Sequence, residues 1–374
     1  MFKSHTNDVD LLYNLDMVKN AYIHIPFCKS KCKYCSFISF ARTDLKEQYL
    51  ASLEKEIKQN YHGEKLDTLY FGGGTPSTLT AKEFENITKL FNIDDNTEIT
   101  AELNPENISQ DYLKNLKLAQ INRLSFGCQT FDDNILKLIG RRHNSYDVKK
   151  SLEFAHNAGF ENISIDFIYG LPTQTVEMFE NDLKQVKNVT HVSLYGLKID
   201  EGCYFYHNMP QNLPDDDIQA QMYLKAIEIL TRQSFEHYEI SNFAKHGFHS
   251  RHNLNYWDNN TYYGFGCAAH GYENGVRYYN LENLEDYIKN PLQHAGTTKL
   301  TLGEQLEEEI FLGFRKREGI NIEHINQKFN IDFKSKYREV LEKYQKYLTE
   351  TNAGFTLTND GILISNVILS EFLA

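Results

Sequence analysis

The stretch NISIDFIYGLPTQTVEMFENDLKQVKNVTHVSLYG, residues 162–196, decides the fold. Its first run, NISIDFI (162–168), is rich in residues that favour strands, and THVSLYG (190–196) is a second such run. Between them, TVEMFENDLKQVKN (175–188) spaces apolar residues at close to 3.6 residues, as an amphipathic helix does, and Thr175 suits an N-cap. Strand, helix and strand in this order predict a parallel βαβ unit with a right-handed crossover.

The same alternation recurs throughout the first half of the chain. Earlier strand-like runs are NAYIHI (20–25), DTLYF (67–71), TEITAEL (97–103) and NRLSFG (122–127). Helix-like stretches lie at 44–61, 109–118 and 145–159, the last with Ser145 as expected N-cap and Gly159 as expected C-terminal stop. Six such repeats predict an α/β protein that forms either an open doubly wound sheet or a barrel, full or partial.

The pattern changes after about residue 200. One helix is expected at 215–232, followed by an aromatic, His-rich segment at 236–272. From about residue 291 the sequence predicts helices. The closing GFTLTNDGILISNVILSEFL predicts a β-hairpin that turns at Asn359-Asp360-Gly361. We expect a helical, winged-helix-like terminal module that serves packing or partner contact. The predicted division is 1–19 (N-terminal lead), 20–235 (barrel), 236–290 (connecting segment) and 291–374 (helical domain).

Composition limits the class of protein. The chain of 374 residues is 41% hydrophobic, with 39 basic and 51 acidic residues and a net charge of −12, which disfavours non-specific nucleic-acid binding. No apolar run approaches the roughly 18 residues that span a bilayer, and the first residues lack the apolar core of a signal peptide. We therefore expect a cytoplasmic protein with six free thiols, of which Cys128, Cys203 and Cys267 are expected to be buried and structural.

Unusual residues stand at nearly every predicted strand end. They are the run FCKSKCKYC after the first strand, FGGGTPSTL (71–79) after the second, Glu102, Gln129, Asp166 and the pair Tyr195-Gly196. In parallel α/β folds the carboxyl ends of the strands share one rim, where functional groups gather. The sequence therefore predicts one large site lined from several strands.

Cys28, Cys32 and Cys35 stand at i, i+4 and i+7 within eight residues. Structural zinc usually takes four ligands, and no second Cys pair follows, although His24 could be a fourth ligand. Three thiolates on a four-iron cube leave one iron open to another ligand. We favour an iron–sulfur cluster whose open iron binds a small molecule; zinc and redox-active thiols remain as alternatives.

The glycine run Gly72-Gly73-Gly74-Thr75 can expose backbone groups to a ligand. It matches neither a Walker loop nor the G-x-G-x-x-G fingerprint, and alone it could be a tight turn. Glu102 and Asp166 could bind ribose hydroxyls or an amine, and Arg141 could pair with a carboxylate. Structural salt bridges are the alternative for these three residues.

Long motifs in this chain resemble those of radical S-adenosylmethionine (SAM) enzymes, and of their HemN-like branch in particular. The cysteine motif is C-x₃-C-x₂-C with an aromatic residue before the last Cys. The matching stretches are YIHIPFCKSKCKYCSF, FGGGTPSTL, AELNPENI, INRLSFGCQTFDDNILKLIGRRH and IDFIYGLPTQT. The resemblance covers the chain from about residue 20 to its end, and it implies a partial (β/α)₆ TIM-like barrel.

The resemblance also implies a cofactor set. Cys28, Cys32 and Cys35 would ligate a [4Fe–4S] cluster whose open iron is chelated by SAM. Arg141 would pair with the SAM carboxylate. The other residues implied in SAM binding are Tyr22 and Tyr34 beside the cluster, Gly73, Gly74 and Thr75 at the methionine amine, and Glu102, Gln129 and Asp166 at the ribose and adjacent polar groups.

Two families within the branch are then open. Oxygen-independent coproporphyrinogen III oxidases carry a fourth cysteine two residues after the third, where this chain has Phe37, and they have a longer N-terminal extension. The text HYEISNFAKHGFHSRHNLNYW resembles instead the haem chaperones of the HemW family. That reading implies haem as cargo, respiratory-chain haem proteins as acceptors and no coproporphyrinogen decarboxylation. The alternatives are the oxidase and a radical SAM enzyme acting on another substrate.

A haem ligand is expected to be an imidazole. His252, in H-N-L-N-Y-W, is the first candidate for the haem ligand and His270 is a second. His246 and His249 lie in a polar segment that predicts an exposed loop. A hydrogen-bonded structural histidine is the alternative for both candidates. We expect no nucleic-acid partner, docking near the inner membrane face without insertion, and either a monomer or a homodimer.

Overall fold

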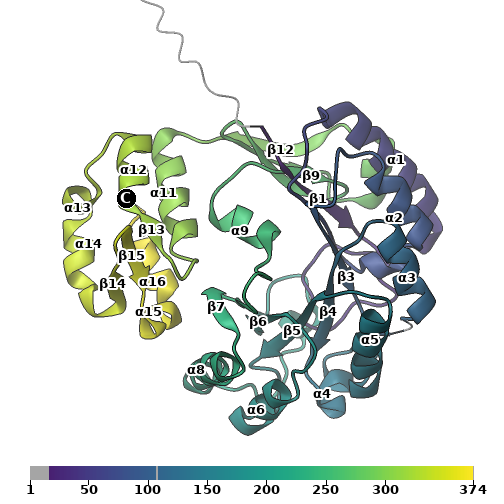
Figure 1. Ribbon diagram of the computed structural model, residues 1–374, viewed down its shortest axis with the longest axis horizontal. Helices are drawn as coiled ribbons and strands as arrows, with labels where there is room; N and C mark the ends of the chain where they lie inside the picture. Colours follow the sequence, from purple (N-terminus) through teal and green to yellow (C-terminus); the bar gives the residue numbers. More distant parts are fainter. Residues whose placement is uncertain (1–16, 107, 374) are drawn as a thin grey trace, which may run out of the picture.

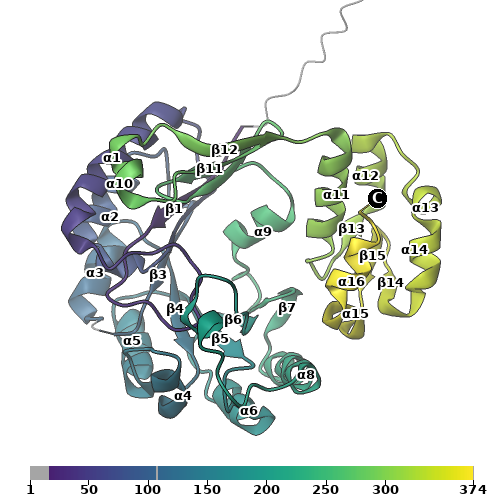
Figure 2. The same cartoon turned by 180° about the vertical axis from the view of Figure 1, so that it is seen from behind.

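The computed structural model describes residues 17–106 and 108–373. Most of the predicted N-terminal lead, residues 1–19, therefore lies outside the described residues. Figures 1 and 2 show a curved sheet with helices on its outer face and a separate C-terminal module that faces the open side of the curve. Within the described ranges, no helix is long and apolar enough to cross a membrane.

One curved nine-stranded sheet forms the barrel, and all six predicted strands are present in it. Its order is β7-β8-β6-β5-β4-β3-β2-β1-β9, so β7 and β9 are edges and the barrel is open. The strands β6, β5, β4, β3, β2, β1 and β9, in this order across the sheet, are all parallel to their neighbours. Strand β8 runs antiparallel to both β6 and β7. The strands are β1 (Asn20–Ile25), β2 (Thr68–Gly73), β3 (Glu98–Leu103), β4 (Arg123–Gln129), β5 (Asn162–Tyr169), β6 (His191–Gly196), β7 (Glu236–Glu239), β8 (Asn242–Ala244) and β9 (Tyr263–Phe265).

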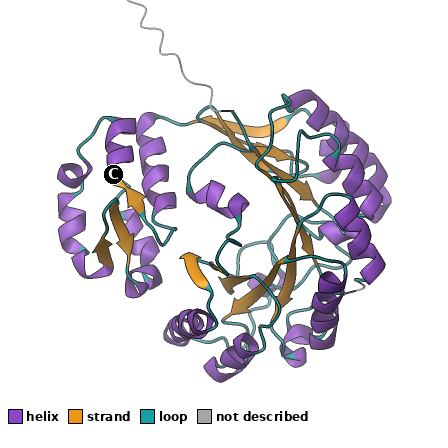
Figure 3. Ribbon diagram, in the orientation of Figure 1, coloured by secondary structure: helices purple, strands orange, loops and turns teal. Residues whose placement is uncertain are grey.

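Helices cover the convex face of this sheet (Figure 3). They bury an apolar layer that includes Leu69, Phe71, Leu124 and Phe126 from the strands. The helices of this half are α1 (Lys46–Asn60), α2 (Ala81–Thr88), α3 (Gln110–Leu118), α4 (Asp133–Leu138), α5 (Ser145–Asn157), α6 (Val176–Lys184), α7 (Tyr204–His207) and α8 (Asp216–Arg232), with 3₁₀ turns η1 (Thr43–Leu45) and η2 (Pro76–Thr78).

Local capping explains where the helices begin and end. Thr175 is the N-cap of α6, as predicted, because its hydroxyl accepts from the Met178 N–H at 3.2 Å. Gly159, at φ +83°, follows the end of α5 as predicted. The prediction of Ser145 as a cap is wrong by one residue, since Asn144 caps α5 and forms a reciprocal pair of hydrogen bonds with Asp147.

The segment after residue 235 completes the barrel and adds a small sheet to it. Strands β7, β8 and β9 extend the main sheet, while α9 (Arg251–Trp257) lies on its concave side. The Glu98 carboxylate accepts from the Arg251 and His252 backbone N–H groups at 3.2 and 3.1 Å, which fixes α9 to β3. The small sheet has the order β10-β11-β12, and its elements are β10 (His270–Glu273), β11 (Val276–Asn280), α10 (Leu284–Lys289) and β12 (His294–Lys299).

The C-terminal module has its own apolar core, which includes Ile310, Phe333, Ile368 and Phe372. Helices surround a three-stranded sheet of order β13-β15-β14. The elements are α11 (Leu302–Gly313), β13 (Ile320–Asn321), α12 (Ile322–Phe329), α13 (Phe333–Lys336), α14 (Arg338–Lys343), η3 (Gln345–Tyr347), β14 (Leu348–Glu350), β15 (Gly354–Leu357), α15 (Asn359–Leu363) and α16 (Ser365–Ser370).

The predicted hairpin turn at Asn359-Asp360-Gly361 is wrong. The antiparallel pair is β14 with β15, and residues 359–361 begin α15 instead. Thr358 caps that helix, since its hydroxyl accepts from the Gly361 N–H at 3.0 Å. A Thr placed before Asn-Asp-Gly thus starts a helix here, because the apolar residues that follow, Ile362 and Ile368, are buried in the module core.

Candidate functional site

A cavity of ≈ 1200 Å³ opens at the carboxyl ends of the barrel strands. Typical small-ligand pockets hold roughly 300–1,000 Å³, so this cavity has room for more than one small molecule. It extends from the cysteine loop to the C-terminal module, which contributes Arg315 and residues 362–366. Eleven of the residues implied in cluster or SAM binding line it: Cys28, Cys32, Tyr34, Cys35, Gly73, Gly74, Thr75, Glu102, Gln129, Arg141 and Asp166.

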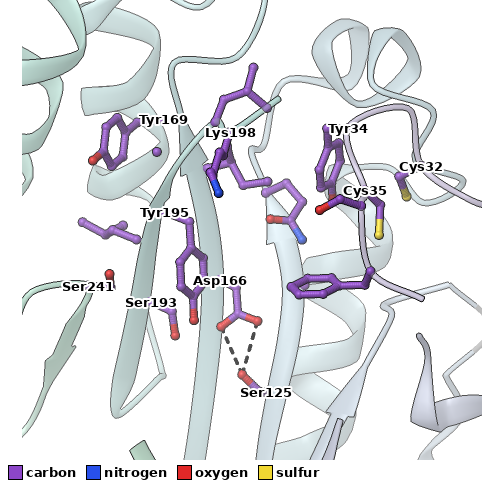
Figure 4. Close-up of a pocket in the computed structure, with 18 of the residues that line it drawn as sticks. Cys32, Tyr34, Cys35, Ser125, Asp166, Tyr169, Ser193, Tyr195, Lys198 and Ser241 are labelled. Atoms are coloured by element: carbon purple, nitrogen blue, oxygen red, sulfur yellow. Dashed lines mark hydrogen bonds between the residues drawn. The ribbon is translucent and has the colours of Figure 1, made fainter. Parts of the chain in front are cut away.

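The three clustered cysteines occupy the loop that follows β1. The Cys28 N–H donates to the Phe40 carbonyl at 3.1 Å, and its Sγ lies 3.2 Å from the Thr75 hydroxyl. The Cys35 N–H donates to the Cys32 carbonyl at 3.2 Å, which places these two residues in one turn. Figure 4 shows Cys32 and Cys35 with Tyr34 at one side of the cavity. All three cysteines are free thiols on the cavity wall.

The thiols do not converge on a single point. Across residues 17–106 and 108–373, no three His, Cys, Asp or Glu side chains gather closely enough to hold one metal ion. A four-iron cluster binds each thiolate to a different iron, so its ligands stand apart from one another. Burial raises the pKa of Cys35 to about 11, with Cys32 and Cys28 adding to the effect, so metal binding there must displace a proton.

The glycine run leaves β2 in a conformation that only small residues allow. Gly73 has φ +111°, and a Cβ added there would lie 2.8 Å from the His24 ring. The Gly74 N–H donates to the Ile25 carbonyl at 2.9 Å, and a Cβ on Gly74 would lie 3.1 Å from Cys28 Sγ. Glycine at both positions therefore lets this loop pass directly beside the cysteine loop.

Arg141 brings a buried positive charge to the cysteines. Its Nη2 donates to the Gly127 carbonyl at 2.6 Å and to Asn104 Oδ1 at 2.8 Å, while Nη1 lies 3.7 Å from Cys32 Sγ. Its buried Nε has no hydrogen-bond partner among the described residues. The guanidinium thus keeps a donor free for an anionic group in the cavity.

Two carboxyls project into the cavity from β3 and β5, the strands on either side of β4. Glu102 Oε1 accepts from the Tyr70 hydroxyl at 2.8 Å, and burial raises the pKa of Glu102 to about 7. Asp166 accepts from the Ser125 hydroxyl at 3.0 Å (Figure 4), and burial raises its pKa as well. Both groups can therefore exchange hydrogen bonds with hydroxyls at neutral pH, as acceptors when ionised and as donors when protonated.

A break in the strand register brings Gln129 to the site. The pairing of β4 with β5 shifts between Gly127 and Gln129, and Gln129 has φ +72°. Such a bulge turns a side chain away from its regular direction. A Cβ on Gly127 would lie 3.0 Å from Gln129 Nε2 and 3.2 Å from Arg141 Nη2, so the amide and the guanidinium are neighbours.

Tyr22 does not line the cavity. Its hydroxyl is 3.1 Å from His24 Nδ1, and its ring stacks on that of Tyr70 at 6.1 Å between centroids. The His24 Nε2 lies 3.0 Å from the Ile38 carbonyl, so both nitrogens of this possible zinc ligand are already engaged. Tyr22 thus contacts the site through Tyr70, whose hydroxyl binds Glu102.

His252 is buried in α9, beneath the cavity, and does not line it. Its Nδ1 is 2.7 Å from the Thr68 hydroxyl, and its Nε2 is 2.8 Å from the Tyr256 hydroxyl. The ring also stacks on Tyr70 at 4.9 Å between centroids. Burial lowers the pKa of His252 to about 3, so the imidazole is neutral, but each nitrogen would have to give up a hydrogen bond to reach an iron.

The other histidines and cysteines named from the sequence lie elsewhere. His270 is exposed and stacks on Tyr279, while His246 and His249 both contact the exposed Glu236. Cys128, Cys203 and Cys267 are buried outside the cysteine loop, as expected of structural thiols. Phe37 is 67% exposed at the cavity wall, in the position of the absent fourth cysteine.

Sequence reasoning missed several residues that complete the cavity. Ser193 comes from β6, Lys198 from the loop after it, Trp257 from the end of α9 and Arg315 from the loop after α11. Arg123 begins β4, on the same strand face as Ser125, and is only 2% exposed. The alternation of Arg123, Ser125 and Gly127 within the predicted strand was the available signal, because alternate residues share one face.

Comparisons with known proteins agree with this geometry. Residues 22–186 match the model of the Radical SAM superfamily, and residues 300–364 match the HemN C-terminal domain. A protein named heme chaperone HemW from Lactococcus lactis is 38% identical, over 96% of this chain and 98% of that protein. A Bacillus subtilis protein of the same name is 36% identical, over 95% of this chain and 99% of that protein.

The fold has a counterpart among solved structures. The coproporphyrinogen III oxidase HemN from Escherichia coli superposes with a TM-score of 0.83, covering 94% of this chain and 89% of that one. The two sequences are 22% identical, so the likeness concerns the fold alone. It confirms the partial α/β barrel with a C-terminal helical module that the sequence predicts.

Proposed function

Since this chain belongs to the HemW family of haem chaperones, a branch of the radical SAM superfamily, we propose that it binds haem and delivers it to respiratory haem proteins. The observation that carries the proposal is similarity over nearly the whole chain to proteins of that name, at 38% and 36% identity. The large cavity at the strand ends and the exposed Phe37, in place of a fourth cysteine, support it.

The cavity wall fits the two cofactors of the superfamily. Cys28, Cys32 and Cys35 would hold a [4Fe–4S] cluster, because the three thiols border one cavity and Gly74 leaves room beside Cys28 Sγ. The unpartnered Nε of Arg141 suits the carboxylate of SAM. Bound together, the cluster and SAM would supply one-electron chemistry at this wall of the cavity.

The remaining residues would orient SAM. Gly73, Gly74 and Thr75 would face its amine, and Glu102, Gln129 and Asp166 would hold its ribose and adjacent polar groups from three strands. Tyr34 lies on the cavity wall beside the cluster cysteines. Tyr22 would act from behind the wall through its stacking on Tyr70, which donates to Glu102.

The haem ligand is proposed to be His252. Ligation requires Nε2 to leave the Tyr256 hydroxyl, which lies 2.8 Å away, and requires the buried imidazole to reach the cavity, which Asn253 and Trp257 of the same helix line. The exposed His270 is the second candidate. His252→Ala and His270→Ala variants, titrated with haem and followed by Soret absorbance, separate the two. Loss of the ligand band in one variant and its retention in the other assigns the ligand.

The proposed setting follows from the family. Acceptors are respiratory haem proteins, reached from a cytoplasmic position at the inner face of the membrane, with the chain acting as a monomer or homodimer. Domain boundaries are proposed at 20–235, 236–290 and 291–374. The first helix of the proposed last domain is α11, which begins at Leu302. It lies within residues 300–364, the range that matches the HemN C-terminal domain.

The deciding experiment compares chaperone with oxidase. Anaerobically purified, cluster-reconstituted protein is incubated with SAM, a strong reductant and coproporphyrinogen III, with a known oxidase as positive control. In parallel, haem-loaded protein is mixed with haem-depleted respiratory membranes, and cytochrome absorbance is followed. We expect haem transfer and no protoporphyrinogen. Turnover of coproporphyrinogen, or a failure of intact protein to bind and release haem, would overturn the proposal.

A Cys32→Ser variant tests the cluster assignment. We expect it to lose iron and the broad visible absorbance of the reconstituted protein, because two thiolates and a hydroxyl replace three thiolates. Cys128→Ser is the matched control, since Cys128 is buried away from the loop. Equal iron content in both variants would contradict the assignment.

A further inference from the structure

Arg123 is a buried cation that faces the cavity with an unpartnered donor among the described residues. The residue is 2% exposed, yet it is one of those that line the cavity. Its buried Nε has no hydrogen-bond partner in the described part of the chain. A guanidinium carries five donors and stays charged when buried, so such an arrangement is costly unless an anion completes it.

The charged and polar groups nearest to Arg123 are already engaged elsewhere. The Glu98 carboxylate binds the N-terminus of α9, and Asp166 binds Ser125. The Tyr70 hydroxyl donates to Glu102, and the Tyr238 hydroxyl is shared with His191 and the Ser250 N–H. Burial acts to lower the pKa of Arg123, but Glu98, Tyr70, Tyr238 and Asp166 together outweigh it and raise the pKa above its usual value.

A second orphaned donor lies beside Arg123. Thr100 on β3 is the register partner of Arg123 on β4, and its buried hydroxyl also lacks a hydrogen-bond partner among the described residues. Of these two unsatisfied donors on paired positions of adjacent strands, Arg123 lines the cavity, whereas Thr100 is fully buried beside it. Arg141 is assigned to the carboxylate of SAM, so an anion bound at Arg123 would be a second one.

We propose that Arg123, with Thr100 beside it, binds a carboxylate of the cargo, namely a propionate of haem, at the floor of the barrel cavity. This inference rests on the proposed function. A planar guanidinium matches a carboxylate in bidentate geometry, and haem carries its charge in its propionates while the rest of the macrocycle is apolar. The apolar macrocycle would then lie in the upper cavity, between the strand ends and the C-terminal module.

The test compares haem with haem dimethyl ester, whose propionates carry no charge. Full-length, cluster-reconstituted wild type, Arg123→Met and Arg123→Lys are titrated with both compounds. Arg232→Met, which removes an exposed arginine at the end of α8, is the matched control. Circular dichroism and the cluster absorbance report folding, and SAM affinity is measured in parallel.

We expect Arg123→Met to bind haem about 10- to 100-fold more weakly, as the loss of a hydrogen bond to a charged group predicts. Its affinity for the ester should equal that of wild type, and wild type should itself prefer haem to the ester by a similar factor. Arg123→Lys should fall in between, and Arg232→Met should be unchanged.

Several outcomes would overturn the inference while leaving the chaperone function standing. They are unchanged haem affinity in Arg123→Met, an equal loss for haem and ester, and a loss of SAM binding alone. If Arg123→Met does not fold, the wild-type preference for haem over the ester and the Arg123→Lys titration decide. A wild type that binds no haem removes the proposed function, and this inference with it.

Discussion

Glu102 should make the protein less stable as the pH rises, and Glu102→Gln should reverse that effect. The folded pKa of Glu102 is about 7, against an ordinary value of 4.5, because the carboxyl is desolvated beside Tyr70 and Asp166. Between pH 4.5 and pH 7 the unfolded chain releases this proton and the folded chain keeps it, so stability falls as pH rises through that window.

The size of the effect follows from the shift. A shift from 4.5 to about 7 corresponds to about 3 kcal/mol at pH 8, and that figure is an upper one because the carboxyl faces a cavity that water can enter. At pH 5, where the unfolded carboxyl is only partly ionised, the same linkage gives below about 1 kcal/mol. Glutamine keeps an oxygen that can accept from the Tyr70 hydroxyl, so no hydrogen bond is lost.

Urea unfolding of the wild type and Glu102→Gln at pH 8 and pH 5 measures this difference. Glu153→Gln, on the exposed face of α5, is the matched control, and we expect it to change stability by less than about 0.5 kcal/mol. Glu102→Gln should also weaken SAM binding in calorimetry. The ionised Glu102 would therefore lower the stability of the protein while it strengthens SAM binding. The reasoning fails if the variant is no more stable than wild type at pH 8, or if its gain is equally large at pH 5.

Three further substitutions test other parts of the structure. Arg141→Met should weaken SAM binding by about 10- to 100-fold in calorimetry, because a hydrogen bond to a charged group is lost. Arg232→Met should leave the affinity for SAM unchanged. Equal SAM affinities for the two variants would mean that Arg141 does not bind SAM. Gly73→Ala should lower stability by about 1–3 kcal/mol in urea unfolding, because φ is +111° and the new Cβ would meet His24; a neutral result would mean that the loop relaxes freely. Thr175→Ala should cost about 1 kcal/mol by loss of the α6 cap, and Thr175→Ser should restore most of it; a Ser variant as unstable as Ala would contradict a capping role.

The strands and the rim of the cavity could be predicted because their determinants are local. Alternating runs such as NISIDFI and helix-spaced runs such as 175–188 specify βαβ units by period alone. Since parallel strands end at one rim, Glu102, Gln129 and Asp166 could be placed together before any coordinates. The cap of α5 was misplaced by one residue because Asn144 and Ser145 are both suitable caps, and only the reciprocal bond with Asp147 distinguishes them.

Long-range contacts were beyond the sequence. The terminal Asn-Asp-Gly has turn chemistry, and burial of Ile362 and Ile368 in the module core makes it a helix instead. His252 stands in a conspicuous motif, but only the fold shows that Thr68 and Tyr256 occupy both of its nitrogens. Arg123 looks like an ordinary polar residue at the start of a strand until the folded structure buries it on the inner side of the curved sheet.

The sequence by itself determined the order of elements, the cysteine loop and the residues that meet at the strand ends, because backbone periodicity and ligand spacing act over a few residues. Only the tertiary structure decided which buried groups are satisfied. That question depends on distances between segments far apart in the chain, such as α9 against β2 and β3, and on the enclosure of charge in the low-dielectric interior. Arg123 and Arg141 therefore stand out as cations with donors to spare only in the folded protein.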